Sequence, residues 1–127
     1  MLRIEGLHAH YGSSHVLHGI DLHVPAGRIC GVLGRNGVGK TTTVRGIMGL
    51  VPPTGGRIML DGTDIAGWPP HMVARAGVAY VPEGRLIFPD LSVLENIRVG
   101  ERKPAKVWTM ERLLTLFPSL RERAGNR

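Results

Sequence analysis

Alternation of apolar and charged residues at the start of the chain predicts strands with one buried face. The alternation begins over residues 2–5, and Gly6 interrupts it before it resumes toward Tyr11. We therefore expect a first strand over residues 2–11 with a slip at Gly6. A second strand is expected over residues 16–24, and its buried side chains should be Ile20, Leu22 and Val24.

The middle of the chain departs from this alternation. Residues 28–33 form a nearly unbroken apolar run, which is typical of a strand that is buried on both faces. Residues 40–50 then have helical spacing, and the buried face should carry Val44, Ile47 and Met48. Turn and strand signals follow, which predict strands at 57–60, 63–65 and 78–81 and a short helix from Pro70 to Ala76.

The last third of the chain has helix signals. Ser92 and Glu95 have the spacing of a capping box, so a helix should run over residues 93–99 and end at Gly100. Apolar residues repeat at helical spacing over 107–117, where Pro118 should break the helix before a polar, basic tail.

Composition narrows the class of protein without defining its function. The 127 residues are enough for one domain with a modest core, and 43% of them are apolar. No apolar run approaches the length of about 20 residues that spans a bilayer, and the amino terminus does not resemble a secretory signal. We expect a cytoplasmic protein whose net charge of +6 forms a solvated basic face rather than a nucleic-acid site.

Neither the cysteine nor the histidines predict a metal site. Cys30 lies in the apolar run and is expected to be a small core residue. His8 and His10 would share one strand face, but no cysteine or carboxylate is placed to complete a set of ligands. We therefore expect the six histidines to be exposed strand and loop residues.

The strongest functional signal is a full match to the phosphate-binding pattern G-x-x-x-x-G-K-[ST]. It lies between the apolar run and the predicted helix, in the order strand, glycine loop, helix that this pattern requires. Its glycines let the backbone turn tightly and point N–H groups inward, while the helix directs its positive dipole end to the same place. The residues are Gly34, Arg35, Asn36, Gly37, Val38, Gly39, Lys40 and Thr41.

This loop predicts binding of a magnesium nucleotide. Lys40 should reach the β- and γ-phosphate oxygens, and the Thr41 hydroxyl should ligate Mg²⁺. Residues 36–42, which include Thr42, should supply backbone or hydroxyl donors to the phosphates.

Taken together, the motifs resemble those of ATP-binding cassette ATPases over the whole chain. Tyr11 lies where this superfamily places the aromatic residue that stacks on adenine. Residues 80–85 (Tyr-Val-Pro-Glu-Gly-Arg) and 87–91 (Ile-Phe-Pro-Asp-Leu) resemble the Q-loop region and the start of the helical subdomain. This wording is most similar to the LivF-type ATP-binding subunits of branched-chain amino-acid importers, with urea and short-chain amide importers as the runner-up.

One residue departs from the superfamily pattern. Glu83 stands where most of these ATPases carry glutamine. A carboxylate can still bind Mg²⁺ or the attacking water, but it cannot donate a hydrogen bond as an amide does. LivF-type subunits resemble this chain in having glutamate there, which implies a role for Glu83 as the Q-loop equivalent and a magnesium ligand. A purely structural loop carboxylate is the alternative.

The resemblance also implies motifs that do not occur in these 127 residues: the Leu-Ser-Gly-Gly-Gln-type signature, the two acids of Walker B and the catalytic base, and the switch histidine. General-base help is typically worth about 10²–10⁴ in rate. We therefore expect this chain alone to be a weak or inactive ATPase. A non-catalytic nucleotide-binding fragment and a P-loop kinase are the competing interpretations.

The resemblance implies an incomplete α/β P-loop fold, with an antiparallel amino-terminal sheet and the start of a parallel core. Residues 1–100 would be the nucleotide-binding core portion, and residues 101–127 the start of the helical subdomain. The implied ligands are ATP and Mg²⁺. The implied partners are membrane-spanning permease subunits and a second ATP-binding subunit, which would place the protein on the inner face of the cell membrane.

Overall fold

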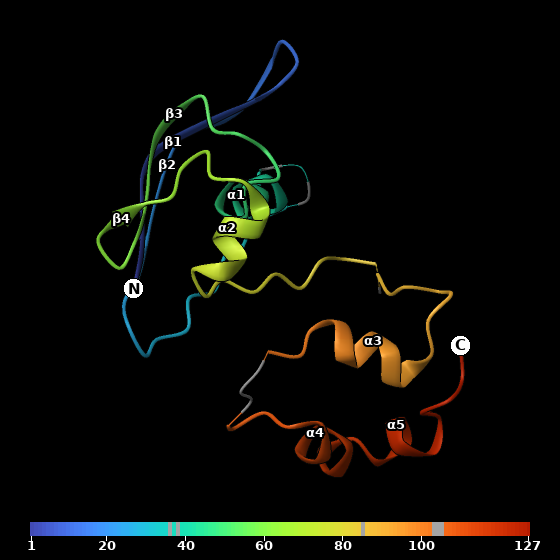
Figure 1. Cartoon of the computed structure of the whole chain (residues 1–127). Helices are drawn as coiled ribbons and strands as arrows, with labels where there is room; N and C mark the ends of the chain where they lie inside the picture. The colour runs from blue at the N-terminus through green and yellow to red at the C-terminus, as the bar shows by residue number, and fades with distance from the viewer. Residues whose placement is uncertain (36, 38, 85, 103–105) are drawn as a thin grey trace. The chain divides into compact units, whose positions relative to one another are not determined.

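The computed structural model describes residues 1–35, 37, 39–84, 86–102 and 106–127. The chain forms two compact units, Met1–Tyr80 and Val81–Arg127. The first unit contains the sheet and two helices, and the second contains three helices (Figure 1). Among the described residues, no helix is both long and apolar enough to cross a bilayer. The predicted division at residue 100 stays a prediction about the larger fold.

Four antiparallel strands form the sheet of the first unit in the order β2-β1-β3-β4 (Figure 1). Their bounds are β1 Leu2–Tyr11, β2 Ser14–Val24, β3 Gly55–Leu60 and β4 Thr63–Asp64. Strand β1 is central, because Leu2 pairs with Val24 on one side and with Leu60 on the other. The expected antiparallel amino-terminal sheet is therefore confirmed.

The predicted slip in β1 is a β-bulge. The register with β2 shifts between Ile4 and Leu7, and Gly6 adopts a φ of 56° between them. Only glycine takes this left-handed conformation without a steric penalty. The Gly6 N–H donates a hydrogen bond of 2.8 Å to the Asp21 carboxylate, which satisfies the donor that the bulge removes from the ladder.

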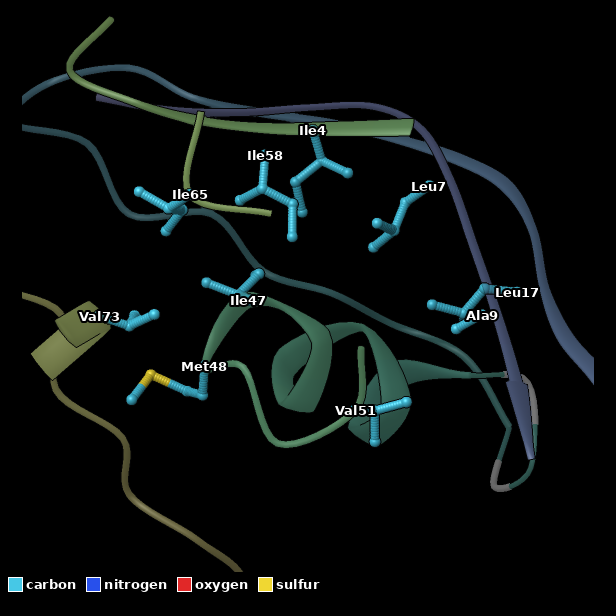
Figure 2. Close-up of a cluster of buried hydrophobic side chains, with 10 residues drawn as sticks. All are labelled: Ile4, Leu7, Ala9, Leu17, Ile47, Met48, Val51, Ile58, Ile65 and Val73. Atoms are coloured by element: carbon cyan, nitrogen blue, oxygen red, sulfur yellow. The ribbon is translucent and has the colours of Figure 1, made fainter. Parts of the chain in front are cut away.

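The core lies between one face of the sheet and the helices α1 (Lys40–Ile47) and α2 (Pro70–Arg75). Figure 2 shows the strand side chains pointing toward Ile47, Met48 and Val73. The buried hydrophobic residues are Ile4, Leu7, Ala9, Leu17, Ile47, Met48, Val51, Ile58, Ile65 and Val73. Removal of these side chains from water stabilises the unit and fixes the position of α1 against β1.

Burial corrects two details of the prediction in this unit. Val44 is exposed, because the buried face of α1 carries Thr43, Gly46 and Ile47 instead. Ile20, Leu22 and Val24 of β2 are only partly buried, and β2 is an edge strand of the sheet.

The predicted strands at residues 28–33 and 78–81 are not formed. Strand geometry requires a hydrogen-bonded neighbour, and neither segment pairs with any described strand. Ile29 is 101% exposed and Leu33 is 94% exposed, so the apolar run lies on the surface. The expectation that Cys30 is a core residue is wrong for the same reason, because its side chain is exposed.

The second unit contains α3 (Val93–Val99), α4 (Met110–Leu116) and α5 (Pro118–Glu122). The capping box at the start of α3 is confirmed: the Glu95 N–H donates to Ser92 Oγ, and the Ser92 N–H donates to Glu95 Oε2 at 2.8 Å. Pro118 ends the preceding helix as predicted, but it also starts α5. The reason is that proline suits the first turn of a helix, where its missing N–H costs nothing.

Candidate phosphate-binding site

The glycine loop at residues 34–39 turns where the motif places its glycines. Gly37 has a φ of 86° and Gly39 a φ of 97°, values that other residues rarely adopt. A Cβ on Gly39 would lie 2.7 Å from Leu17 Cδ2, so a side chain there would require the Leu17 side chain to shift. Leu17 therefore packs against the loop, a contact that no sequence motif predicts. The predicted donors Asn36 and Val38 lie outside the described residues.

The side chain of Lys40 folds back over this loop. Its ammonium group donates a hydrogen bond to the carbonyl oxygen of Gly34, the first residue of the motif. The contact holds a positive charge at the loop, where the pattern predicts the β- and γ-phosphates. Gly34 and Arg35 are exposed, so solvent reaches this part of the loop.

Helix α1 begins at Lys40 without a side-chain cap. Its N-cap residue is Gly39, which has no side chain, and its first turn contains no acidic residue. The first N–H groups of a helix have no partner within the helix, and the helix dipole adds positive potential there. The start of α1 therefore offers backbone donors to an anion.

The three threonines at the start of α1 differ in their surroundings. Thr43 is buried, and its hydroxyl donates a hydrogen bond of 2.8 Å to the Gly39 carbonyl, so it serves the fold. Thr41 is exposed and Thr42 is half-buried, which leaves the Thr41 hydroxyl accessible to an external ligand.

Tyr11 reaches α1 from the end of β1. A hydrogen bond with the Thr42 side chain, and then the Arg45 guanidinium, lower the pKa of Tyr11 below its ordinary value, against the opposing effect of burial. The hydroxyl groups of Tyr11 and then Tyr80 in turn raise the pKa of Arg45. The fold thus joins Tyr11 to the helix that follows the phosphate loop. Neither Arg45 nor Tyr80 carried a sequence signal for this arrangement.

Both magnesium ligands predicted from the sequence bind through oxygen atoms. Thr41 supplies a hydroxyl and Glu83, which is exposed in the second unit, supplies a carboxylate. Both donor types suit Mg²⁺. The described residues contain no group of three or more histidine, cysteine or acidic side chains that could hold a metal ion. The part played by Glu83 stays a prediction.

Comparison with known proteins gives the same family from sequence and from fold. The chain is 35% identical to the probable branched-chain amino acid transport ATP-binding protein LivF of Archaeoglobus fulgidus, over 95% of this chain and 52% of the relative. It is 34% identical to the high-affinity branched-chain amino acid transport ATP-binding protein BraG of Pseudomonas aeruginosa, over 100% of this chain and 56% of the relative. The chain therefore spans about half the length of these relatives.

Relatives that are named for other roles also match. The lipopolysaccharide export system ATP-binding protein LptB of Escherichia coli K12 is 42% identical, over 68% of this chain and 36% of the relative. Among solved structures, an ATP-binding subunit of an ABC transporter superposes with a TM-score of 0.82 at 28% identity, over 98% of this chain and 53% of that one. The expected P-loop fold of the ABC ATPase type is thereby confirmed.

The family model described as ABC transporter matches residues 17–126, which include the glycine loop, α1 and the segment around Glu83. The chain belongs to the ABC transporter ATP-binding family.

Proposed function

We propose that the chain binds Mg-ATP at residues 34–42 as part of the ATP-binding subunit of an importer for branched-chain amino acids. The observation that carries the proposal is the loop itself: Gly37 and Gly39 turn the backbone, α1 begins without a cap, and Lys40 lies across the loop. An anion with several oxygens matches this combination of backbone donors and one ammonium group.

Each side chain has a task in this proposal. Lys40 exchanges the Gly34 carbonyl for the β- and γ-phosphate oxygens, which are stronger acceptors because they are charged. The exposed Thr41 hydroxyl, and by resemblance the Glu83 carboxylate, hold Mg²⁺, while Thr42 donates to a phosphate. Bound Mg²⁺ would supply positive charge that offsets the negative charge of the phosphates. Tyr11 offers its ring to the adenine base.

The branched-chain assignment rests on the extent of the similarity. Three relatives named for branched-chain amino-acid transport match 95%, 100% and 81% of this chain, whereas the lipopolysaccharide export relative matches 68%. We therefore favour the importer assignment, with membrane-spanning permease subunits and a second ATP-binding subunit as partners at the cytoplasmic face of the membrane. Hydrolysis would require the signature, the catalytic base and the switch histidine, which these 127 residues do not contain.

Replacement of Lys40 tests nucleotide binding. Titration calorimetry should show Lys40→Ala binding Mg-ATP roughly 10- to 100-fold more weakly than the wild type, because a charge-assisted hydrogen bond contributes about 1.5–3 kcal/mol. The loss should be smaller for AMP, which lacks the phosphates that Lys40 is proposed to contact. Lys106→Ala removes an exposed lysine from the second unit and is the matched control. Equal affinities for ATP in all three proteins would contradict the proposed site.

A chimera tests the transported solute and the catalytic state. This chain would replace the corresponding half of an ATPase subunit from a branched-chain amino-acid importer, and the complex would be assayed for ATP-dependent leucine uptake in vesicles. We expect uptake that Lys40→Ala abolishes. Coupling to the permease of a urea or short-chain amide importer, but not to the branched-chain permease, would support the runner-up. Lysine-dependent phosphate release by the isolated chain would exclude the non-catalytic interpretation.

A further inference from the structure

Four of the six histidines lie together on the open face of the sheet. We call His8, His10, His15 and His18 the histidine cluster. His8 and His10 share one face of β1, and the register places His18 opposite His8 and His15 opposite His10. The register shift between Ala9 and His10 brings His15 to the same side as His18, although the two are three positions apart along β2.

The four rings are in contact. The ring centroid of His15 lies 4.0 Å from that of His18, 4.3 Å from that of His10 and 5.1 Å from that of His8. His8 Nδ1 and His15 Nε2 are 2.9 Å apart, and His10 Nδ1 lies 2.8 Å from the Thr54 hydroxyl. The cluster therefore joins β1, β2 and the segment that enters β3.

This geometry excludes a positive charge on both rings of the contact between His8 and His15. The contact between His8 and His15 is a hydrogen bond only if one nitrogen carries a proton and the other offers a lone pair, whereas two imidazolium rings would both be donors and would repel. Burial, and then the charges of His18, His10 and His8, lower the pKa of His15 below its ordinary value. No carboxylate among the described residues contributes to this shift.

The groups around the cluster do not compensate its charge. Gly19 of β2 and Gly55 of β3 lie against the His8 ring and have no side chain, and the Thr54 hydroxyl is neutral. Glu5 of β1 is paired with Arg57 of β3 at 2.9 Å. On α1, Arg45 acts on Tyr11 and Tyr80, and Lys40 on Gly34. Both groups are positively charged, so neither would stabilise a protonated cluster.

We infer that the histidine cluster is an acid-sensitive latch that holds the end of the β1–β2 hairpin, and with it Tyr11, in place for the nucleotide. Tyr11 follows His10 directly and pairs with Ser14 at the end of the hairpin. Protonation of neighbouring rings breaks the contact between His8 and His15 and drives β1 away from β2. The nucleotide part of this inference rests on the proposed function, but the stability part does not.

The sign of the pH effect follows from the direction of the shift. A histidine whose pKa is lowered by folding binds fewer protons in the folded chain than in the unfolded chain. The first unit should therefore lose stability as the pH falls through and below about 6.5, the ordinary histidine value. Above that pH His15 is neutral in both states, and stability should not depend on its protonation.

Urea unfolding at pH 7.5 and pH 5.5 tests the latch. Trp68 packs against the core of the first unit, so its fluorescence in a Trp108→Phe background reports on that unit. The wild-type midpoint should fall at pH 5.5, and the fall should be lost in His8→Gln/His15→Gln. The other two histidines provide the matched control, because His23→Gln/His71→Gln should keep the wild-type pH dependence. Equal pH dependence in both double variants would overturn the latch. If His8→Gln/His15→Gln does not fold at pH 7.5, His15→Gln alone is compared with His23→Gln.

A chelator separates a proton effect from a metal effect. The latch predicts the same midpoints with and without EDTA. Loss of stability at pH 7.5 on addition of EDTA would overturn the latch in favour of a bound metal.

Ligand binding tests the link to Tyr11. The wild type and the double variant are compared at the same pH, so protonation of the ligand affects both measurements equally. At pH 5.5, His8→Gln/His15→Gln should bind Mg-ATP more tightly than the wild type, whereas inorganic tripolyphosphate, which has no base to stack, should bind both equally. Equal ATP affinities would overturn the link to Tyr11. Failure of either ligand to bind at pH 7.5 would instead refute the proposed function and leave the urea experiment to decide the latch.

Discussion

The two units of the chain are stabilised by different forces. Met1–Tyr80 encloses ten buried hydrophobic side chains, contributed by strands and helices that are far apart in the sequence. In Val81–Arg127 no described side chain is fully buried, and polar contacts dominate instead. The Val93 and Leu94 N–H groups donate to the carbonyls of Asn126 and Ala124 at 2.8 Å and 3.0 Å.

This difference predicts unequal responses to mutation. The stabilising free energy from burial of apolar surface grows with the area buried. A hydrogen bond that is open to solvent contributes only about 0.5–1.5 kcal/mol net. The second unit should therefore unfold more easily than the first. Its Trp108 is exposed, with Arg112 stacked 4.4 Å from its ring centroid, and it provides a separate fluorescence signal in a Trp68→Phe background.

The largest effect is expected for truncation in the core. Ile58→Ala should lower the free energy of unfolding of the first unit by about 2–5 kcal/mol, because the side chain is 0% exposed and its removal leaves a cavity. Urea unfolding followed by Trp68 fluorescence measures this loss. Leu116→Ala, at the exposed end of α4, is the control and should change the stability of its own unit by less than about 1 kcal/mol. Similar losses of unfolding free energy in both variants would show that the two units do not differ in how much their apolar side chains stabilise them.

An intermediate effect is expected for Asn96. Its side-chain amide donates to the carbonyls of Phe88, Leu91 and Ser92, and its side-chain oxygen accepts from the Phe88 N–H at 2.9 Å. Asn96→Ala should destabilise the second unit by about 1–3 kcal/mol, measured by Trp108 fluorescence, and leave the first unit unchanged. Asn126→Ala retains the backbone carbonyl that accepts from Val93, so it should have little effect. A loss at Trp68 as well as Trp108 would show that the units unfold together.

The smallest effect is the acid sensitivity of α3. Hydrogen bonds from the Ser92 backbone and then the Ser92 side chain lower the pKa of Glu95 below its ordinary value. A lowered carboxylate pKa means that this contribution is present above the unfolded-state pKa and is lost as the pH falls through the folded-state value. Far-UV circular dichroism should show helix loss in that acid range. Glu95→Gln keeps the capping geometry and cannot titrate, so it should lack this step. A step of unchanged size in Glu95→Gln would assign it to another group.

The sequence predicted those features that depend on neighbouring residues. The bulge at Gly6 and the capping box of Ser92 and Glu95 are examples, because each is formed by contacts within a few positions. The order of loop and helix at Gly39 and Lys40 was predicted in the same way.

Features that depend on distant partners were not predicted. The apolarity of residues 28–33 indicates a tendency to be buried but does not specify which strand would pair with them, and the segment is exposed. The contacts of Arg45 with Tyr11 and Tyr80 require the packing of α1 to be known first. The grouping of the histidines depends on register shifts, each of which changes the face on which later residues of β2 lie.

The position of the core along the chain has a consequence for biosynthesis. Among the described residues, every buried hydrophobic side chain lies between Ile4 and Val73, so the core of the first unit is complete before the helices of the second unit are translated. Domains generally fold as units during synthesis, and the amino-terminal ones fold first. The sheet can therefore close around Ile58 and Val73 on the ribosome, and the phosphate loop can take its turn before the rest of the protein has been made.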